Sequence, residues 1–258
     1  MSVQFDPITR LTPVHLGSWW TPERRRKYPL CEERPPLAPE REEFEPKTEP
    51  AFSLRLAGAP PTPAVWFLSK DRSELLQVQR DRFTRNWTRE SPEAAPYPSY
   101  TELLPKFIED FNDFREFLSA EGFAQPSVVQ CELTYLNPLP ATPHYWETHG
   151  DIERFFALWG GQTTEGFLPA PEDAQIAVRY VVPDDRGMPI GRLYVTLQPA
   201  VREDGAEVYL LNLTVRGRPG YGGNEGVLSF FDVAHEWIVR GFTTLTTKPM
   251  HQLWGRTQ

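Results

Sequence analysis

Apolar and polar residues alternate with a period of two along four stretches in the second half of the chain. This alternation is typical of strands that bury one face. The connections between the last three stretches contain turn-forming residues, so we expect these three to form an antiparallel meander. The four predicted strands are Ser127–Leu136, Gln175–Val182, Arg192–Gln198 and Glu207–Arg216.

In two longer stretches, Tyr100–Ala120 and Val227–Thr244, apolar residues recur every three or four positions. This spacing predicts helices that bury one side. A shorter helix is expected at Thr21–Lys27, where the first residue is placed to cap it. A second short helix is expected at Asp151–Trp159, with Asp151 as its cap.

Prolines interrupt the first half, and its strand pattern is weaker. An opening strand is expected within Val3–Trp19. A second meander is expected from Ala51–Leu56, Ala64–Ser69 and Glu74–Phe83. Between them, Arg34–Pro50 is rich in proline and glutamate with interspersed basic residues, which is typical of a solvated connector.

The same order of elements therefore occurs twice. We predict an α+β fold of two pseudo-repeats, residues 1–124 and 125–258, each with a strand, a short helix, a three-stranded antiparallel meander and a long helix. A local echo supports the duplication, because Gly17–Thr21 and His144–Thr148 each precede a short helix. In such a fold the helices cover one face of a curved sheet and leave the other face open.

The alternation also assigns side chains to the two faces of the sheet. Apolar residues such as Cys131, Tyr180 and Leu211 are expected on the face that the helices cover. The opposite face is then either an ordinary wet surface or a binding surface held by rigid strands. Glu132 and Arg179 are expected to pair across neighbouring strands. The candidate binding residues on this face are Gln77, Gln79, Glu132, Thr134, Arg179, Tyr194, Asn212 and Arg216.

Charge and composition narrow the class of partner. The chain has 27 Lys and Arg against 35 Asp and Glu, a formal charge of −8, which argues against a duplex-DNA partner. Its apolar runs fall short of the about 18 residues of a membrane span, and Met1–Trp20 lacks the features of a secretory signal. We therefore expect a cytoplasmic protein without membrane contact, in which Cys31 and Cys131 are reduced.

Motifs for catalysis are absent from the sequence. There is no Gly-x-Ser-x-Gly, and neither cysteine has a catalytic signature. The Gly217–Gly223 turn lacks the Lys-Ser/Thr of a phosphate-binding loop; an anion held there with help from Arg216 and Arg218 is the alternative to a simple turn. No catalytic residue, cofactor or metal ligand is predicted.

The histidines do not have metal-ligand spacing. A loose cluster of His144, Glu147, His149 and Asp151 is expected to be a solvated loop, with a metal site as the alternative. His235 lies beside the apolar side of the last helix, where we expect it to be buried and hydrogen-bonded to a neighbouring segment.

Arginines gather in one stretch of the first half. Arg80, Arg82 and Arg85, together with Trp87, have the chemistry to contact nucleic acid. Because Asp81 lies among them and the net charge is negative, a salt-bridged strand end on the protein surface is the favoured interpretation. Nucleic acid is not expected as a partner.

Three segments are similar in order and spacing to a sporadically distributed, uncharacterised family of bacterial proteins. The segments are Leu76–Trp87, with the pattern Leu-Gln-Val-x-x-Asp-x-Phe-x-x-Asn-Trp, then Tyr135-Leu136-Asn137-Pro138 and Ala234-His235-Glu236. The chain resembles this family over nearly its whole length. The resemblance implies no established activity and transfers no catalytic role, and the scattered distribution of the family is typical of accessory or defence loci.

The absent motifs and the polar sheet face lead to one functional hypothesis. The chain is expected to be a non-enzymatic binding or assembly module that engages a protein partner, or another copy of itself, through the open sheet face or the proline-rich connector. The alternative is an enzyme or small-ligand sensor in which Glu132, Arg179 and Asn212 converge in a cleft between the halves.

Overall fold

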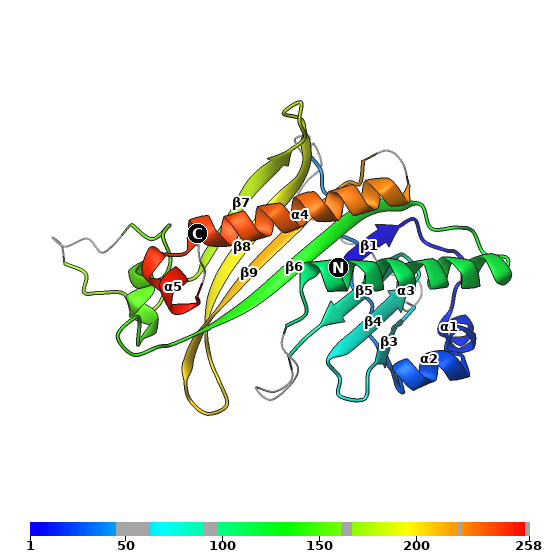
Figure 1. The fold of residues 1–258 in the computed structure, drawn as a ribbon, viewed down its shortest axis with the longest axis horizontal. Helices are drawn as coiled ribbons and strands as arrows, with labels where there is room; N and C mark the ends of the chain where they lie inside the picture. Colours follow the sequence, from blue (N-terminus) through cyan, green and yellow to red (C-terminus); the bar gives the residue numbers. More distant parts are fainter. Residues whose placement is uncertain (45–61, 90–96, 161–166, 221–222, 256–258) are drawn as a thin grey trace. The chain divides into compact units, whose positions relative to one another are not determined.

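The structure, a computed structural model, describes residues 1–44, 62–89, 97–160, 167–220 and 223–255. Runs of antiparallel strands are separated by helices along the chain (Figure 1), and the coarse prediction of an α+β fold is confirmed. Within the described residues the strands are β1 (Ser2–Phe5), β2 (Leu30–Arg34), β3 (Ala64–Leu68), β4 (Glu74–Gln79), β5 (Arg82–Trp87), β6 (Val128–Pro140), β7 (Ile176–Pro183), β8 (Pro189–Val201) and β9 (Glu207–Gly217). The helices are α1 (Pro13–Trp19), α2 (Pro22–Lys27), α3 (Tyr100–Ala120), the 3-10 helix η1 (His149–Arg154), α4 (Asn224–Leu245) and α5 (Lys248–Leu253).

Hydrogen bonding places the strands in the order β2-β3-β4-β5-β1-β6-β9-β8-β7. The chain forms two compact units. Unit 1 is Met1–Glu132 with Gly217–Leu228, and unit 2 is Leu133–Arg216 with Ser229–Gln258. These bounds differ from the predicted division after residue 124, because unit 1 also contains the beginnings of β6 and α4.

Unit 1 contains an antiparallel meander, β2 to β5, and β1 lies between β5 and the beginning of β6. The single strand predicted at Glu74–Phe83 is wrong: β4 and β5 form a hairpin that turns at Arg80 and Asp81. Strand β2 was not predicted, because it borders the proline-rich stretch. The strand predicted at Ala51–Leu56 lies outside the described residues.

One long helix and an aromatic core hold unit 1 together. Helix α3 has the predicted bounds, and Ser99 and Glu102 form a capping box at its start. Its side chains pack on the sheet: the ring of Phe114 stacks on Phe83 of β5 at 5.5 Å and meets Trp19 edge-on at the same separation. These large buried rings supply much of the apolar area that stabilises the unit.

A buried ionic cluster joins α3 to β5 beside this core. Arg85 is hydrogen-bonded to Asp110 of α3 and donates to the Tyr28 hydroxyl at 2.7 Å. Its second nitrogen, Nη2, pairs with Glu74 at 2.8 Å, and Lys27 pairs with the other oxygen of Asp110 at 3.1 Å. Burial, together with the charge of Asp110, raises the pKa of the Tyr28 hydroxyl. The two buried charges of the cluster, Arg85 and Asp110, thus depend on their partners to remain buried.

Asp110→Asn is expected to destabilise unit 1 by about 3 kcal/mol, the lower end of the cost of breaking a buried ion pair, because the buried Arg85 guanidinium keeps only its pair with Glu74. The measurement is urea unfolding followed by circular dichroism. Asp113→Asn in the same helix is the matched control: its carboxylate is about half exposed and pairs with Arg24, so the expected cost is about 0–1 kcal/mol. Equal losses in the two variants would contradict this account of the cluster.

Unit 2 contains the rest of β6, followed in strand order by β9, β8 and β7. Helix α4 packs on one face of these strands, where a Cβ added to Gly241 would lie 3.1 Å from Leu193. The residues predicted on this face are buried on β8 and β9. On β7, Tyr180 lies on the predicted face, opposite Leu193, but it is 37% exposed. Strand β7 is the last strand in the order, so among the described residues it has a neighbouring strand on one side only.

The short elements of unit 2 differ from the predictions. A 3-10 helix, η1, replaces the α-helix predicted at Asp151–Trp159, and its cap is Thr148. Asp151 accepts hydrogen bonds from the backbone N–H groups of Glu147 and Thr148. Helix α5 was not predicted. Within the described part of the chain, no helix combines the length and the apolar character that crossing a membrane requires.

Candidate functional site

The polar face of the unit 1 sheet is covered by residues 35–44, which we call the strap. Four side chains beneath it form one row across four neighbouring strands, because the register places Gln79 opposite Arg82, Arg82 opposite Gln4, and Gln4 opposite Gln130. We call this set the glutamine row. Its members are at most 5% exposed.

The glutamine row binds the backbone of the strap. Gln79 donates to the carbonyl of Leu37 at 2.9 Å and accepts from the N–H of the same residue at 3.1 Å. Gln4 does the same with Glu40, at 3.0 and 3.2 Å. A primary amide suits this task because it carries a donor and an acceptor side by side.

The remaining contacts fix the second half of the strap. Gln130 accepts from the N–H of Glu42 at 2.7 Å and donates to the carbonyl of Glu40. Arg82 donates to the carbonyl of Ala38 at 3.1 Å. Arg218, in the turn before α4, donates to the carbonyl of Glu42 at 3.2 Å. The sheet therefore binds the strap at four residues between positions 37 and 42.

The strap crosses the strands in an extended conformation. The row spans three strand spacings, about 14 Å, and five residues of strap connect its two ends. This gives about 3 Å per residue, which is the rise of a polyproline II chain and twice that of an α-helix. Such a chain has no hydrogen bonds within itself, so the side chains of the sheet supply them.

The side chains of the strap are exposed, with few exceptions. Leu37 is 48% exposed, and Pro39 and Glu40 are exposed as well. Glu42 is the exception at 3%. Recognition of the strap therefore depends on its backbone far more than on its sequence. The interpretation of Arg34–Pro50 as a solvated connector holds for most side chains of the strap but not for its backbone, which the sheet binds. Residues 45–50 lie outside the described residues.

Two of the predicted binding residues lie on this covered face. Gln77 and Gln79 are 4% and 3% exposed, so their expected place on an open face is wrong. Strand alternation identified the polar face correctly but carries no information about a segment that covers it. Sequence reasoning missed Gln4 because the opening strand was not delimited.

A variant that combines Gln4→Ala with Gln130→Ala is expected to free the strap for proteolysis. The change removes four hydrogen bonds to Glu40 and Glu42, each of which contributes about 0.5–1.5 kcal/mol. Trypsin should then cut after Arg41 about tenfold faster or more. Mass spectrometry of timed digests measures this rate.

The control is Gln198→Ala on the exposed part of β8, which leaves the strap untouched. Cleavage after Arg41 at the same rate in the wild type, the control and the double variant would show that the glutamine row does not hold the strap.

Five of the predicted residues lie on the polar face of unit 2. Arg179 of β7 is directly opposite Tyr194 of β8. The guanidinium of Arg216 of β9 lies over the same tyrosine ring, 5.3 Å from its centroid. The hydroxyl of Thr134 of β6 is 2.9 Å from that of Thr214, which in turn donates to Asn212 at 3.3 Å. The structure thus brings the predicted residues together across β6, β9, β8 and β7.

This face carries positive charge. Arg179 is exposed, and Arg192 and Arg216 are half-buried. The arrangement is suited to binding groups that carry negative charge or accept hydrogen bonds.

Glu132 precedes Thr134 on the same face of β6. It lies at the end of unit 1, opposite Ser2 of β1. The predicted pairing of Glu132 with Arg179 across neighbouring strands is wrong, because β9 and β8 lie between β6 and β7 in the strand order. Sequence alternation gave the face of each residue, but not the order of the strands.

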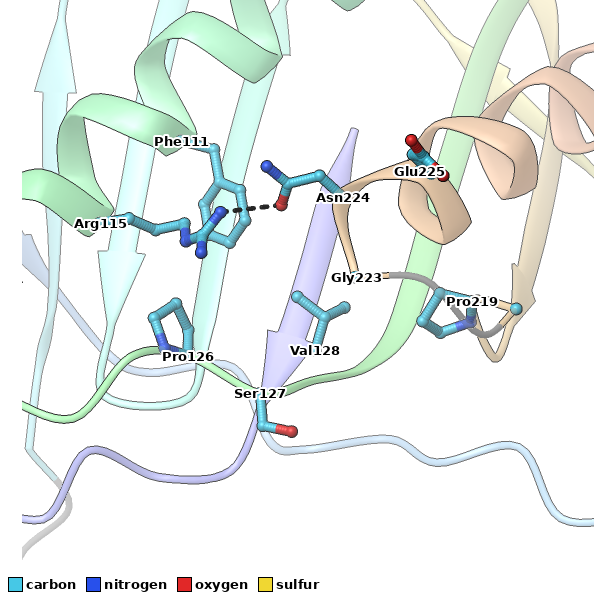
Figure 2. A pocket seen from close by; sticks show the side chains of 10 residues that line it. Phe111, Arg115, Pro126, Ser127, Val128, Pro219, Gly223, Asn224 and Glu225 are labelled. Atoms are coloured by element: carbon cyan, nitrogen blue, oxygen red, sulfur yellow. Dashed lines mark hydrogen bonds between the residues drawn. The ribbon is translucent and has the colours of Figure 1, made fainter.

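Unit 1 also contains a pocket of about 820 Å³ at the start of α4. Figure 2 shows Arg115 of α3 reaching across it to Asn224, with a distance of 2.9 Å between Nη1 and the amide oxygen. Val128 and Pro219 line other walls. Arg115 was not singled out from the sequence, because it lies on the polar side of a predicted helix.

The glycine turn before α4 is held close to the helix. A Cβ on Gly226 would lie 2.3 Å from the carbonyl oxygen of Gly220, so only glycine allows this approach. Arg216 and Arg218, the predicted helpers of an anion site here, do not line the pocket. Arg218 binds the strap instead.

His235 makes the predicted hydrogen bond to a neighbouring segment but is half-buried rather than buried. Its Nδ1 is 2.9 Å from the hydroxyl of Tyr135 on β6. Asn137, two residues further along that strand, donates to the carbonyl of Leu211 on β9 at 3.3 Å. These motif residues therefore connect β6 to its neighbours in unit 2. Burial lowers the pKa of the His235 imidazole below its ordinary value of 6.5, while the charge of Asp232 acts weakly in the other direction.

The lowered pKa of His235 predicts a loss of stability in acid. Because the unfolded chain binds the proton more readily, the contribution of neutral His235 is lost as the pH falls through 6.5. His235→Gln should remove this part of the pH dependence. The measurement is the difference in unfolding free energy between wild type and variant over the range of about pH 5.5–7.5; a difference that does not change with pH would contradict the assignment.

The loose histidine cluster is part of the loop around η1. His149 lies 3.1 Å from the carbonyl of Val208, and its backbone N–H donates to Glu207 at 2.7 Å. Asp151 is used in capping. Across the described ranges, no group of three His, Cys, Asp or Glu side chains is placed to hold a metal ion. Burial raises the pKa of the Cys131 thiol, which is free, as is Cys31.

The arginine-rich stretch is directed inward rather than outward. Arg82 binds the strap, and Arg85 belongs to the buried ionic cluster; they are 5% and 3% exposed. Arg80 is 3.4 Å from the hydroxyl of Thr62. The expected surface salt-bridged strand end is wrong for Arg85, because its ion pairs are buried. Neither buried guanidinium is available to phosphate groups.

Comparison with family models, with curated proteins and with solved structures found no match to this chain.

Proposed function

We propose that the chain is a non-enzymatic binding module whose unit 2 binds an extended segment of a protein partner on its polar sheet face. One observation carries this proposal: unit 1 already binds an extended segment, the strap, on its own polar face. In unit 2 the corresponding side chains are exposed or half-buried, and they include Arg179, Tyr194 and Arg216.

The charge of this face indicates the kind of segment. Three arginines and a tyrosine project from adjacent strands, and hydroxyl and amide groups lie beside them. An acidic segment would gain charge-assisted hydrogen bonds from Arg179, which is exposed on this face, and the exposed hydroxyl of Thr134 would bind its backbone. Because the groups stand on strands, they need little reordering to bind.

The proposal includes the wider setting of the protein. We place it in the cytoplasm, as an α+β fold of two pseudo-repeats with the helices on one face of a curved sheet. Its partner is a protein, and the resemblance described above suggests a bacterial accessory or defence locus. The element order supports the pseudo-repeat, because in each half the opening strand lies beside the last strand of the meander.

The test combines Arg179→Glu with Arg216→Glu. Protein purified from its own host is examined by native mass spectrometry for an added protein mass. The double variant is expected to lose the partner while its urea unfolding midpoint changes little. A control that reverses two other exposed arginines of unit 2, Arg202→Glu with Arg240→Glu, changes the net charge equally and should keep the partner. Retention of the partner by the Arg179→Glu, Arg216→Glu double variant would contradict the proposal for this face.

A small-ligand sensor is the second candidate, and the unit 1 pocket favours it. Its volume is in the range of small-molecule sites, about 300–1,000 Å³, and Arg115 offers a charged group. The same mass spectra test this candidate, since a retained mass of a few hundred daltons that Arg115→Ala removes would identify a ligand in the pocket. The cleft predicted from Glu132, Arg179 and Asn212 receives no support from the strand order.

A further inference from the structure

The strand order leaves β7 at the edge of the sheet. Among the described residues, no strand pairs with its outer side, and β8 pairs with its inner side over the full length. The outer side of an edge strand presents N–H and C=O groups that can pair with another strand. Figure 1 shows β7 and β8 as a long hairpin at the end of unit 2.

The two edges of the sheet differ in how they are protected. Strand β2, at the other end, carries three charged residues in five, and Glu32 pairs with both Arg34 and Arg72. Charged side chains of this kind discourage pairing with a foreign strand. Strand β7 has the sequence Ile-Ala-Val-Arg-Tyr-Val-Val-Pro, with Arg179 as its one charge, and its register is regular until Val182.

Apolar surface accompanies this edge on both faces of the strand. Tyr180 is 37% exposed on the helix side, and Val181 is 49% exposed on the polar side. Ile176 and Val178 are half-buried. Met188, just beyond the turn, is 62% exposed. A strand that pairs here would cover apolar side chains as well as backbone groups, and both effects favour association.

We propose that β7 pairs antiparallel with β7 of a second copy of this chain, about a two-fold axis at Tyr180. A two-fold axis makes the same strand meet itself. Side chains alternate between the two faces of a strand. The faces of the joined sheet are therefore continuous only when the two residues of each opposite pair both have even numbers or both have odd numbers. With Tyr180 on the axis, Ala177 lies opposite Pro183 of the partner subunit, and seven of the eight residues are paired.

The single charge of the strand selects this register. Moving the axis to Arg179 would place two guanidinium groups directly opposite each other, which is unfavourable. With the axis at Tyr180, Arg179 faces Val181 of the partner subunit instead. The registers with the axis at Val178 or at Val181 pair only five residues, 176–180 or 179–183. The dimer uses the strand edge, whereas the function proposed above uses the sheet face, so each can fail without the other.

The experiment is sedimentation equilibrium of the full chain over a concentration series that reaches about 200 µM. The high concentrations are needed because an interface made by one short strand from each copy is small, and small interfaces are weak or transient. Wild-type protein is expected to dimerise. Val181→Lys places a second positive charge opposite Arg179 of the partner subunit and should raise the dissociation constant about two- to tenfold. Val181→Glu places an opposite charge there and should lower it by a similar factor.

A matched control is Leu30→Lys on β2, the other edge, where the residue is 37% exposed; it should leave the dissociation constant unchanged. Urea unfolding of each variant checks that the fold is kept. A wild-type chain that stays monomeric over the whole series overturns the proposal. So does a dimer that responds to Leu30→Lys, or one whose dissociation constant moves in the same direction for Val181→Lys and Val181→Glu.

Discussion

Backbone hydrogen bonding between the glutamine row and the strap is the constraint on which the polar side of unit 1 depends. Buried amides without partners would each cost free energy comparable to a lost hydrogen bond. A polyproline II chain has the complementary need, because none of its backbone groups bond to one another. Gln79, Gln4 and Gln130 meet both needs at once. The polar residues on this face can be buried only because the strap lies across them.

The sides of the two units that the long helices cover are built alike, whereas their polar sides differ. In each unit a long helix packs on the sheet through buried aromatic and aliphatic side chains, such as Phe114 in α3 and Phe231 in α4. On the polar side, unit 1 buries its glutamines under the strap, whereas Arg179 and Thr134 of unit 2 are exposed. The difference in exposure, rather than a difference in architecture, leads us to assign the binding role to unit 2.

The sequence predicted elements well where local signals coincided. Helix α3 has a capping box, a strict apolar period and a glycine after its end, and its bounds were predicted without error. The β4–β5 hairpin was missed because Arg80 and Asp81 make a turn without glycine or proline. The candidate site was predicted as a face, but not as a contact: Gln4 and Glu40 are 36 positions apart, and Arg115 and Asn224 are 109 apart. No local pattern encodes which distant segments meet.

The hydrogen bonds between the sheet and the strap also explain where proline occurs in the strap. The sheet uses the N–H groups of Leu37, Glu40 and Glu42. Proline has no N–H group and fixes its own backbone near the extended conformation. The prolines of the strap, Pro35, Pro36 and Pro39, lie only at positions whose N–H the sheet does not use. Substitution at most strap positions should therefore leave its docking intact, whereas proline is excluded from three of them, so the strap can vary in chemistry while its path stays fixed.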